Sequence, residues 1–291
     1  MGSGHRNMEY ILLDDISTAL ELQISRRSMN INDGQFLSVY HGHGMEFDDL
    51  RDYAEGDSVR DIDWKASSRA GEILVRRNSA EKRYHTLFVI DSRRTMDADT
   101  PEGISKQELA LKTFGTIGYM LNRQSADQGM LCSSDQVDFM PFGSGNVHLQ
   151  RMMNHYADLA GTGEKSISEL LKYYAEHIRR RCLLFVITDL NGCRELLKDF
   201  PSETAYRNEM FIIRTEDAFL SADNTIDVRS GMYSSDAYLL NTEIRKEEMR
   251  VRDEILSESN KLFAQHAVRS MSLSNADEIL EKTAELFELR R

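Results

Sequence analysis

The sequence predicts a doubly wound α/β fold, in which a mostly parallel sheet carries helices on both faces. Apolar runs of strand length alternate with amphipathic stretches of ten or more residues, which are typical of helices. Two of the runs, residues 87–90 and 183–187, are apolar at every position, as strands covered on both faces must be. An aspartate, Asp91 or Asp189, follows each of them closely. Ligands of open α/β sheets bind outside the carboxyl ends of the strands, so these aspartates mark a candidate site.

The composition is that of a protein with a core of its own. A chain of 291 residues has room for one large or two modest domains. Its net charge of −12 argues against a nucleic-acid partner, because affinity for phosphate backbones comes from Lys and Arg. No apolar run approaches the roughly 20 residues of a membrane span, and no signal-peptide pattern is present, so we expect a cytoplasmic protein without a span. Three cysteines, Cys132, Cys182 and Cys193, form no metal-ligand pair and are expected to be reduced thiols.

Three segments are predicted: residues 1–27, 28–82 and 83–291. The first begins with a few residues that resemble a tag and continues as a helix over residues 9–27. Apolar side chains recur there at helical spacing and are expected to pack on the domain: Ile11, Leu12, Ile16, Leu20 and Ile24.

The segment 28–82 is rich in glycine and in closely alternating charges, which predicts a small β segment with an ion-pair network packed on the main domain. The alternative is a solvated surface whose ion pairs contribute about 0–1 kcal/mol each. Trp64, the only tryptophan, lies among these charges, and we expect its ring to be buried as an anchor. Residues 73–77 are predicted to form a short strand that leads to the sheet.

After Asp91 the elements of the third segment follow in a regular order. A helix is predicted over residues 105–124, followed by strands at 130–133 and 137–142. The link between these two strands is too short for a parallel crossover, so they form an antiparallel hairpin at the sheet edge. The remaining expected elements are a helix with Leu149, Met152, Met153 and Tyr156 on its buried face, a helix at 167–180, strands at 183–188 and 210–213, a hairpin of 225–228 with 237–240, a helix at 242–265, a strand at 268–273 and a last helix that starts at Ser274.

Asp91 and Asp189 meet at one rim if their strands are parallel neighbours. Two carboxylates a few ångströms apart repel each other unless a cation or an arginine lies between them. The alternative is that each aspartate only caps the helix that follows. The paired pattern, together with a hydroxyl residue at Thr95, favours a shared site.

Two stretches of the sequence resemble known families. The run Asp-Ser-Arg-Arg-Thr at 91–95, with Gly161-Thr162 and Thr188-Asp189, resembles the three loops of the metal-ion-dependent adhesion site of von Willebrand factor type A domains, a Rossmann-like fold. The resemblance implies a Mg²⁺ site made of Asp91, Thr95, Thr162 and Asp189. The block 44–64 is similar to the signature of the bacterial domain-of-unknown-function family 58, carried here by Glu46, Arg51, Tyr53, Asp57, Arg60, Asp63 and Trp64.

Arg93 departs from the adhesion-site pattern, because it stands where that family has its first serine. A guanidinium cannot ligate a cation, and at about 4 Å it would oppose a divalent ion by several kcal/mol. In the first interpretation Arg93 replaces the ion and bridges Asp91 and Asp189. In the second it turns to solvent, and the oxygen ligands hold Mg²⁺ together with waters.

Three hypotheses of function follow. The first is a non-catalytic protein-interaction module that needs no cofactor, and the family resemblance implies a MoxR-type AAA+ ATPase as its partner in protein maturation or remodelling. The second is a metal-dependent hydrolase that uses Asp91 and Asp189, although no His or Glu adjoins either of them in sequence to act as a general base. The third is a scaffold or oligomerisation protein that associates through helices 9–27 and 242–265 and keeps a vestigial site.

Overall fold

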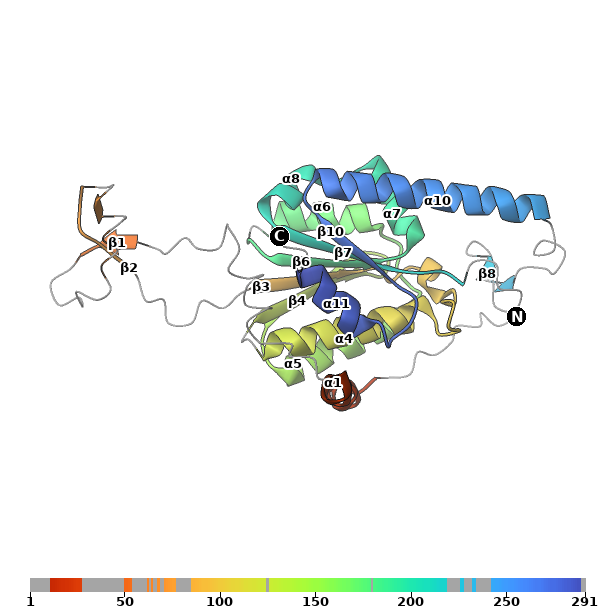
Figure 1. Cartoon of the computed structure of the whole chain (residues 1–291), viewed down its shortest axis with the longest axis horizontal. Coiled ribbons are helices and arrows are strands. Elements are labelled where there is room, and N and C mark those ends of the chain that lie inside the picture. The colour runs from red at the N-terminus through yellow and green to blue at the C-terminus, as the bar shows by residue number, and fades with distance from the viewer. Residues whose placement is uncertain are drawn as a thin grey trace. The chain divides into compact units, whose positions relative to one another are not determined.

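The chain forms two compact units, Ile31–Arg83 and a larger unit of Met1–Asn30 with Tyr84–Arg291 (Figure 1). The larger unit is an α/β domain, and the smaller contains a short antiparallel strand pair. The computed structural model describes residues 11–27, 50–53, 62, 64, 67–68, 71–76, 85–123, 126–178, 180–218, 226–227, 232–233 and 242–288.

The larger unit is built on a six-stranded sheet with the order β10-β7-β6-β3-β4-β5 (Figure 1). All neighbours pair in parallel except β4 and β5, which form the predicted antiparallel hairpin at the edge. Counted along the chain, the first and fourth strands of this sheet lie side by side, so the strand order reverses between β3 and β6. The strands are β3 (His85–Ile90), β4 (Asp127–Ser133), β5 (Val137–Gly143), β6 (Leu183–Thr188), β7 (Glu209–Thr215) and β10 (Arg269–Leu273).

Helices cover both faces of this sheet, which confirms the predicted doubly wound α/β class (Figure 1). One face carries α1 (Leu13–Arg27), α4 (Lys106–Asn122), α5 (Asn146–Leu159) and α11 (Ile279–Glu288). The other carries α6 (Ile167–His177), α7 (Leu190–Lys198), α8 (Ser202–Arg207) and α10 (Thr242–Gln265). The described residues contain no helix long and apolar enough to cross a membrane.

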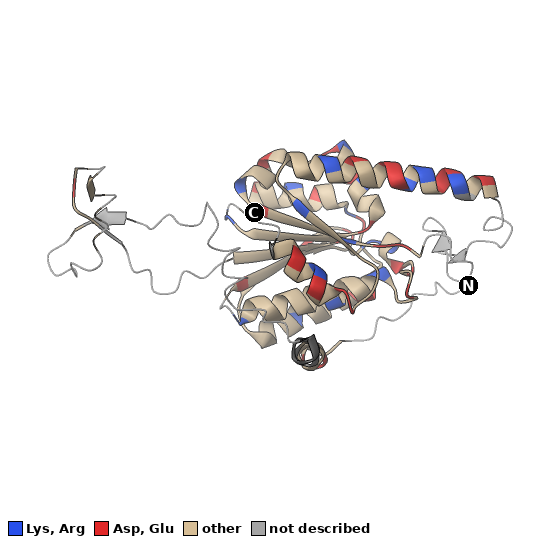
Figure 2. Cartoon of the chain, viewed as in Figure 1, with Lys and Arg blue, Asp and Glu red and all other residues tan. Residues whose placement is uncertain are grey.

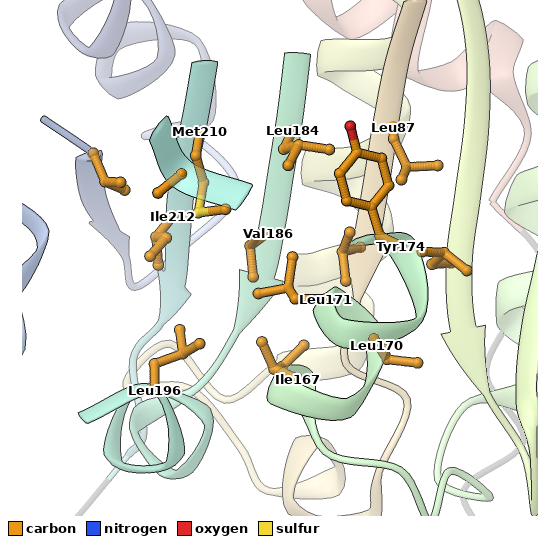
Figure 3. Close-up of a cluster of buried hydrophobic side chains, with 14 of the residues drawn as sticks. Leu87, Ile167, Leu170, Leu171, Tyr174, Leu184, Val186, Leu196, Met210 and Ile212 are labelled. Carbon is orange, nitrogen blue, oxygen red and sulfur yellow. The ribbon is translucent and has the colours of Figure 1, made fainter. Parts of the chain in front are cut away.

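The two faces of the sheet bury different side chains because successive strand residues point in opposite directions. Leu87 and Val186 face α6 and α7, in a cluster with Ile167, Leu171 and other aliphatic residues (Figure 3). On the opposite face aromatic rings pack in a row that runs from α4 to α11. The ring centroids lie 4.6 Å apart for Phe88 and Phe114, 5.4 Å for Phe88 and Phe185, 4.9 Å for Phe185 and Phe211, and 5.4 Å for Phe211 and Phe287.

The N-terminal helix packs on the domain, as predicted. Leu13, Ile16 and Leu20 are buried, whereas Leu12, which precedes the helix, is 56% exposed. Gly115 of α4 permits this contact, because a Cβ there would lie 2.5 Å from Cδ1 of Ile16. The helix begins at Leu13, and the first part of the predicted range, residues 9–10, lies outside the described residues.

Several boundaries differ from the prediction. Helix α6 ends at His177, three residues earlier than expected. Strand β8 (Ile226–Asp227) pairs with β9 (Met232–Tyr233), while the expected partner strand, 237–240, lies outside the described residues. The short helices α7, α8 and η2 (Arg94–Asp97) were not predicted as elements.

In the smaller unit, β1 (Leu50–Asp52) pairs antiparallel with β2 (Leu74–Arg76). The prediction that Trp64 is buried is wrong, because its side chain is 64% exposed and the nearby Ile62 is the buried apolar residue. Tyr53 is also exposed, at 41%. The other signature residues lie outside the described residues (Glu46, Asp57, Arg60 and Asp63) or have no described side chain (Arg51), so the predicted ion-pair network stays a prediction.

Candidate functional site

Asp91 and Asp189 meet at the carboxyl ends of β3 and β6, where the strand order reverses. The strands are in register with Ile90 opposite Ile187, and the Asp91 N–H donates to the Ile187 carbonyl at 2.9 Å. Both aspartates are buried, at 1% and 0% exposure. The sequence prediction of one shared rim is therefore confirmed, and the rim lies where ligands bind in open α/β sheets.

The Asp91 carboxylate is saturated by donors of its own chain. Its Oδ1 accepts from the backbone N–H of Arg93 at 3.1 Å and from Arg93 Nε at 2.9 Å. Its Oδ2 accepts from Arg93 Nη2 at 2.7 Å and from the Thr188 hydroxyl at 2.9 Å. A carboxylate has about four lone-pair sites, and all four accept hydrogen bonds here.

Arg93 bridges two carboxylates, but the second is not the expected one. Its Nη1 donates to Oε1 of Glu195 in α7 at 2.5 Å, so the prediction that Arg93 joins Asp91 to Asp189 is wrong in its second half. Burial alone would lower the pKa of Arg93, but the hydrogen bonds and charges of Asp91 and Glu195 outweigh burial and raise it. Glu195 reaches the site because α7 starts directly after Asp189. It lies about one and a half helical turns beyond the start of that helix.

Asp189 is held by a lysine that the sequence reasoning missed. Lys106 is fully buried, and its Nζ donates to Asp189 Oδ2 at 2.7 Å and to Oδ1 of Asp217, which follows β7. Asp189 Oδ1 also caps α7 by accepting from the Gly192 N–H at 3.1 Å. Burial opposes ionisation of Asp189, yet Lys106 and the Gly192 N–H together hold its pKa below the usual value. Burial raises the pKa of Asp217, and Lys106 only partly offsets this effect.

Two signals in the sequence point to this second ion pair. Lys106 is the first residue of α4, where a positive charge opposes the helix dipole and therefore needs a local partner. Asp217 repeats the pattern of Asp91 and Asp189, since it is an acid that closely follows an apolar strand.

The two predicted threonine ligands are placed differently from each other. Thr95 Oγ1 is buried and has no hydrogen-bond partner among the described residues. Thr162 is exposed, and its hydroxyl donates to the Leu159 carbonyl at 2.7 Å, which closes the turn after α5. The structure thus brings Asp91, Arg93 and Asp189 to one rim, while the hydroxyl of Thr162 is hydrogen-bonded within the turn that follows α5.

Three loops at this rim are bonded into what we call the loop platform, residues 91–97, 133–136 and 161–166. The Ser92 hydroxyl donates to the Ser133 carbonyl at 2.6 Å, and the Gly163 N–H donates to the Ser92 carbonyl at 3.0 Å. The Glu164 N–H donates to the Ser134 carbonyl at 2.7 Å. Only glycine fits at position 163, because a Cβ there would lie 2.5 Å from Ser92 Oγ and 2.9 Å from the Ser92 backbone.

The rim residues do not fit a Mg²⁺ ion. Mg²⁺ needs free oxygen ligands in near-octahedral geometry, but Asp91 has no lone pair to spare and Asp189 already accepts from Lys106 and Gly192. The described residues also contain no cluster of three or more His, Cys, Asp or Glu side chains that could hold a metal. The charges of Arg93 and Lys106 take the place at this rim that a metal ion has in an adhesion-type site.

Comparison with solved structures finds von Willebrand factor type A domains. The chain is similar to a type A protein from Catenulispora acidiphila, with a TM-score of 0.38 and 6% identity over 70% of this chain and 42% of the other. It is also similar to the SpRpn10 VWA domain, with a TM-score of 0.39 and 11% identity over 69% of this chain and 95% of the other. At these scores the similarity carries no further argument.

Comparison with curated proteins finds mycobacterial relatives. Uncharacterized protein Mb1516 of Mycobacterium bovis and Uncharacterized protein Rv1480 of Mycobacterium tuberculosis are each 24% identical over 202 residues. The match covers 68% of this chain and 63% of each relative. A family model described as "Protein of unknown function DUF58" matches residues 49–217, which is more than half of the chain. This protein therefore belongs to the DUF58 family.

Proposed function

We propose that this protein is a non-catalytic interaction module that binds a protein partner through the loop platform. The observation that carries the proposal is that the base of the platform is held by hydrogen bonds while polar side chains are exposed on its surface. Its backbone and buried serines are bonded to one another, while Arg94, Thr162 and Glu164 are exposed at its surface. A preformed surface loses little conformational entropy when a partner binds, which favours recognition.

The charges below the platform support a binding role over a catalytic one. Asp91 and Asp189 are engaged by Arg93 and Lys106, so neither carboxylate is placed to activate a water molecule through a metal. No observation favours the metal-dependent hydrolase. Recognition at this rim is instead expected to be independent of divalent metal, with Arg94 offering a guanidinium to a carboxylate of the partner.

The partner class that we propose is a MoxR-type AAA+ ATPase. Support for this class comes from the family resemblance of the sequence, and the platform adds a suitable binding surface. The module would act as an adaptor through which such an ATPase matures or remodels other proteins.

A pull-down tests both parts of the proposal. The purified chain is immobilised and mixed with a MoxR-type AAA+ ATPase from the same organism, with and without EDTA. We expect the ATPase to be retained equally in both conditions, and Arg94→Glu to weaken retention. Arg250→Glu is the matched control, because Arg250 is also exposed and lies on α10, which is not one of the three platform loops.

Each outcome has a distinct meaning. Loss of binding with EDTA would overturn the metal-independent rim. Weakening by Arg250→Glu but not by Arg94→Glu would show that the partner binds α10 and not the platform, which is the result expected of a scaffold that associates through its helices.

A further inference from the structure

A basic pocket lies at the opposite end of the sheet from the loop platform. It has a volume of about 890 Å³ and lies between the end of α6, the start of β6 and helix α8. Strand β6 begins beside this pocket and ends at Thr188, directly before Asp189, so the length of the strand separates the pocket from the rim. The charged and aromatic residues of its lining are Tyr174, Arg180, Arg181, Glu203, Tyr206 and Arg207.

The charge of the pocket is opposite to that of the whole chain. Among the described residues, its lining contains three arginines and one acid, Glu203, whereas the chain as a whole carries a net charge of −12. Arg180 and Arg181 belong to a run of three consecutive arginines, residues 179–181, in the sequence. Such a concentration of positive charge in an otherwise acidic protein attracts anionic groups to this site.

Arg180 is an exposed arginine in the lining of this pocket. Among the described residues it forms no ion pair with a carboxylate. Its Nη1 lies 2.7 Å from Nε2 of His85, and its guanidinium lies 5.7 Å from the centre of the Phe142 ring. Burial and then the charge of Arg180 lower the pKa of His85, against the opposing effect of Asp127, so a neutral ring is favoured beside the arginine.

The walls of the pocket are held by hydrogen bonds. The Tyr174 hydroxyl donates to the Arg180 carbonyl at 2.6 Å and lies 2.8 Å from Oδ1 of Asn208. The Tyr174 ring extends from the core cluster towards the end where the strands begin (Figure 3). At the mouth, Tyr206 is 90% exposed, and large exposed aromatic side chains with arginines beside them are typical of protein-binding surfaces.

We propose that this pocket binds an acidic peptide segment of a protein partner, with carboxylates of the segment paired to Arg180 and Arg207 and its backbone against Tyr206. Arginine suits this task because its planar guanidinium pairs with a carboxylate through two hydrogen bonds. A pocket of bounded volume accepts a few side chains, while the acidic surface around it opposes the long phosphate backbone of a nucleic acid. The proposal does not rest on the function of the loop platform.

Fluorescence anisotropy with a labelled oligoglutamate peptide tests the proposal on the full chain. We expect the wild type to bind this peptide in low salt, to release it as salt is added and not to bind an oligoserine peptide of the same length. Arg207→Glu should lower the affinity by about tenfold or more, because it replaces an attraction with a repulsion. Tyr206→Ala, at a side chain exposed to solvent, should lower it less without affecting folding.

Two matched controls make the result specific. Arg250→Glu changes the net charge equally and also removes an exposed helical arginine that is paired with a glutamate four residues away, as Arg207 is with Glu203. Lys112→Glu makes a charge change of the same size on α4, at a partly exposed lysine paired with Glu108. Both should keep the wild-type affinity. Failure of the wild type to bind oligoglutamate, equal losses in all three charge variants, or tighter binding of a single-stranded oligonucleotide would each overturn the proposal.

Discussion

Single charged residues decide what the rim can do, and their partners come from distant parts of the chain. Lys106 and Asp189 are separated by 83 positions, and Arg93 and Glu195 by 102. The sequence indicated that two buried carboxylates would need positive charge beside them, but it could not show that two different cations supply it. A lone arginine was expected to serve both aspartates, whereas the fold provides one cation for each.

Replacing Lys106 tests how strongly the domain depends on its buried ion pairs. Lys106→Met leaves Asp189 and Asp217 facing each other without a cation, and removing one member of such a buried pair typically costs about 3–5 kcal/mol. Lys112→Met is the control on the same helix, because the Lys112–Glu108 pair is partly exposed and contributes about 0–1 kcal/mol. The measurement is the free energy of unfolding in urea. Equal losses in the two variants would contradict the role assigned to Lys106.

The pH dependence of stability tests the ionisation of Asp189. Its pKa in the folded state lies below its value in the unfolded chain, so between the two values the unfolded state binds more protons. The stabilising contribution is therefore complete above the unfolded value, about 3.9, and is lost as the pH falls through the lower folded value. Asp189→Asn lacks this contribution at every pH. We expect the variant to be less stable than wild type near neutral pH, with a difference that shrinks below about pH 4; a difference that stays constant in acid would contradict the prediction.

Metal titration tests whether Arg93 keeps divalent ions away from Asp91. The wild type should give no measurable heat with Mg²⁺ in calorimetric titration, because the donors on Asp91 occupy its lone pairs. Arg93→Ser restores the serine of the adhesion-site pattern and removes two of the four hydrogen bonds to Asp91, because the backbone N–H remains. The variant should therefore gain affinity for Mg²⁺.

The control is Arg94→Ser, which removes the neighbouring arginine but leaves the Asp91 ion pair intact. It should behave as the wild type does. Tight Mg²⁺ binding by the wild type would make the rim a working adhesion-type site instead.

At the scale of elements, the sequence predicted best where hydrophobic periodicity is strong. The strands of the sheet centre, the edge hairpin and the long helix α10 agree with their predicted positions, because each has an uninterrupted apolar or helical pattern. On α10 the exposed half carries acidic and basic residues in alternation (Figure 2), as expected of a solvated face. The helices α7 and α8 have only nine and six residues, and helices this short depend for their stability on tertiary contacts that a single sequence does not contain.

The packing of α1 on the domain can be tested by mutation. Ile16 is buried against Gly115 of α4, so Ile16→Ala should leave a cavity and destabilise the larger unit by about 2–4 kcal/mol. Leu12→Ala is the control at a mostly exposed position only four residues away, with an expected loss below about 0.5 kcal/mol. Urea unfolding followed by far-UV circular dichroism measures both. A small loss for Ile16→Ala would mean that α1 does not contribute to the core.

At the scale of the whole molecule, charge and apolar surface are clearly separated in the larger unit. Its central strands are almost free of charged residues, while the helices around them carry both signs (Figure 2). The two core layers, aliphatic towards α6 and aromatic towards α4 and α11, follow from the alternation of strand side chains. This part of the fold could be predicted from the sequence because burial on both faces leaves a strong signal in each strand.

The smaller unit could not be predicted in the same way, and Trp64 shows why. An aromatic residue among charges was expected to be buried beneath them, but a short segment rich in charged residues offers few apolar neighbours, and the structure leaves the ring exposed. Since Trp64 is the only tryptophan, its fluorescence reports on this unit alone, whereas circular dichroism reports mainly on the helices of the larger unit.

We therefore expect the two signals to differ during unfolding. The emission maximum of the native protein should lie close to that of free tryptophan in water and change little in urea, while the dichroism shows a cooperative transition. Trp64→Phe should leave that transition unchanged within about 0.5 kcal/mol, because the exposed ring contributes no core packing. A strongly blue-shifted native emission, or a loss of about 3–5 kcal/mol on replacing Trp64 with alanine, would mean instead that the ring is buried in solution and anchors the smaller unit as a core aromatic does.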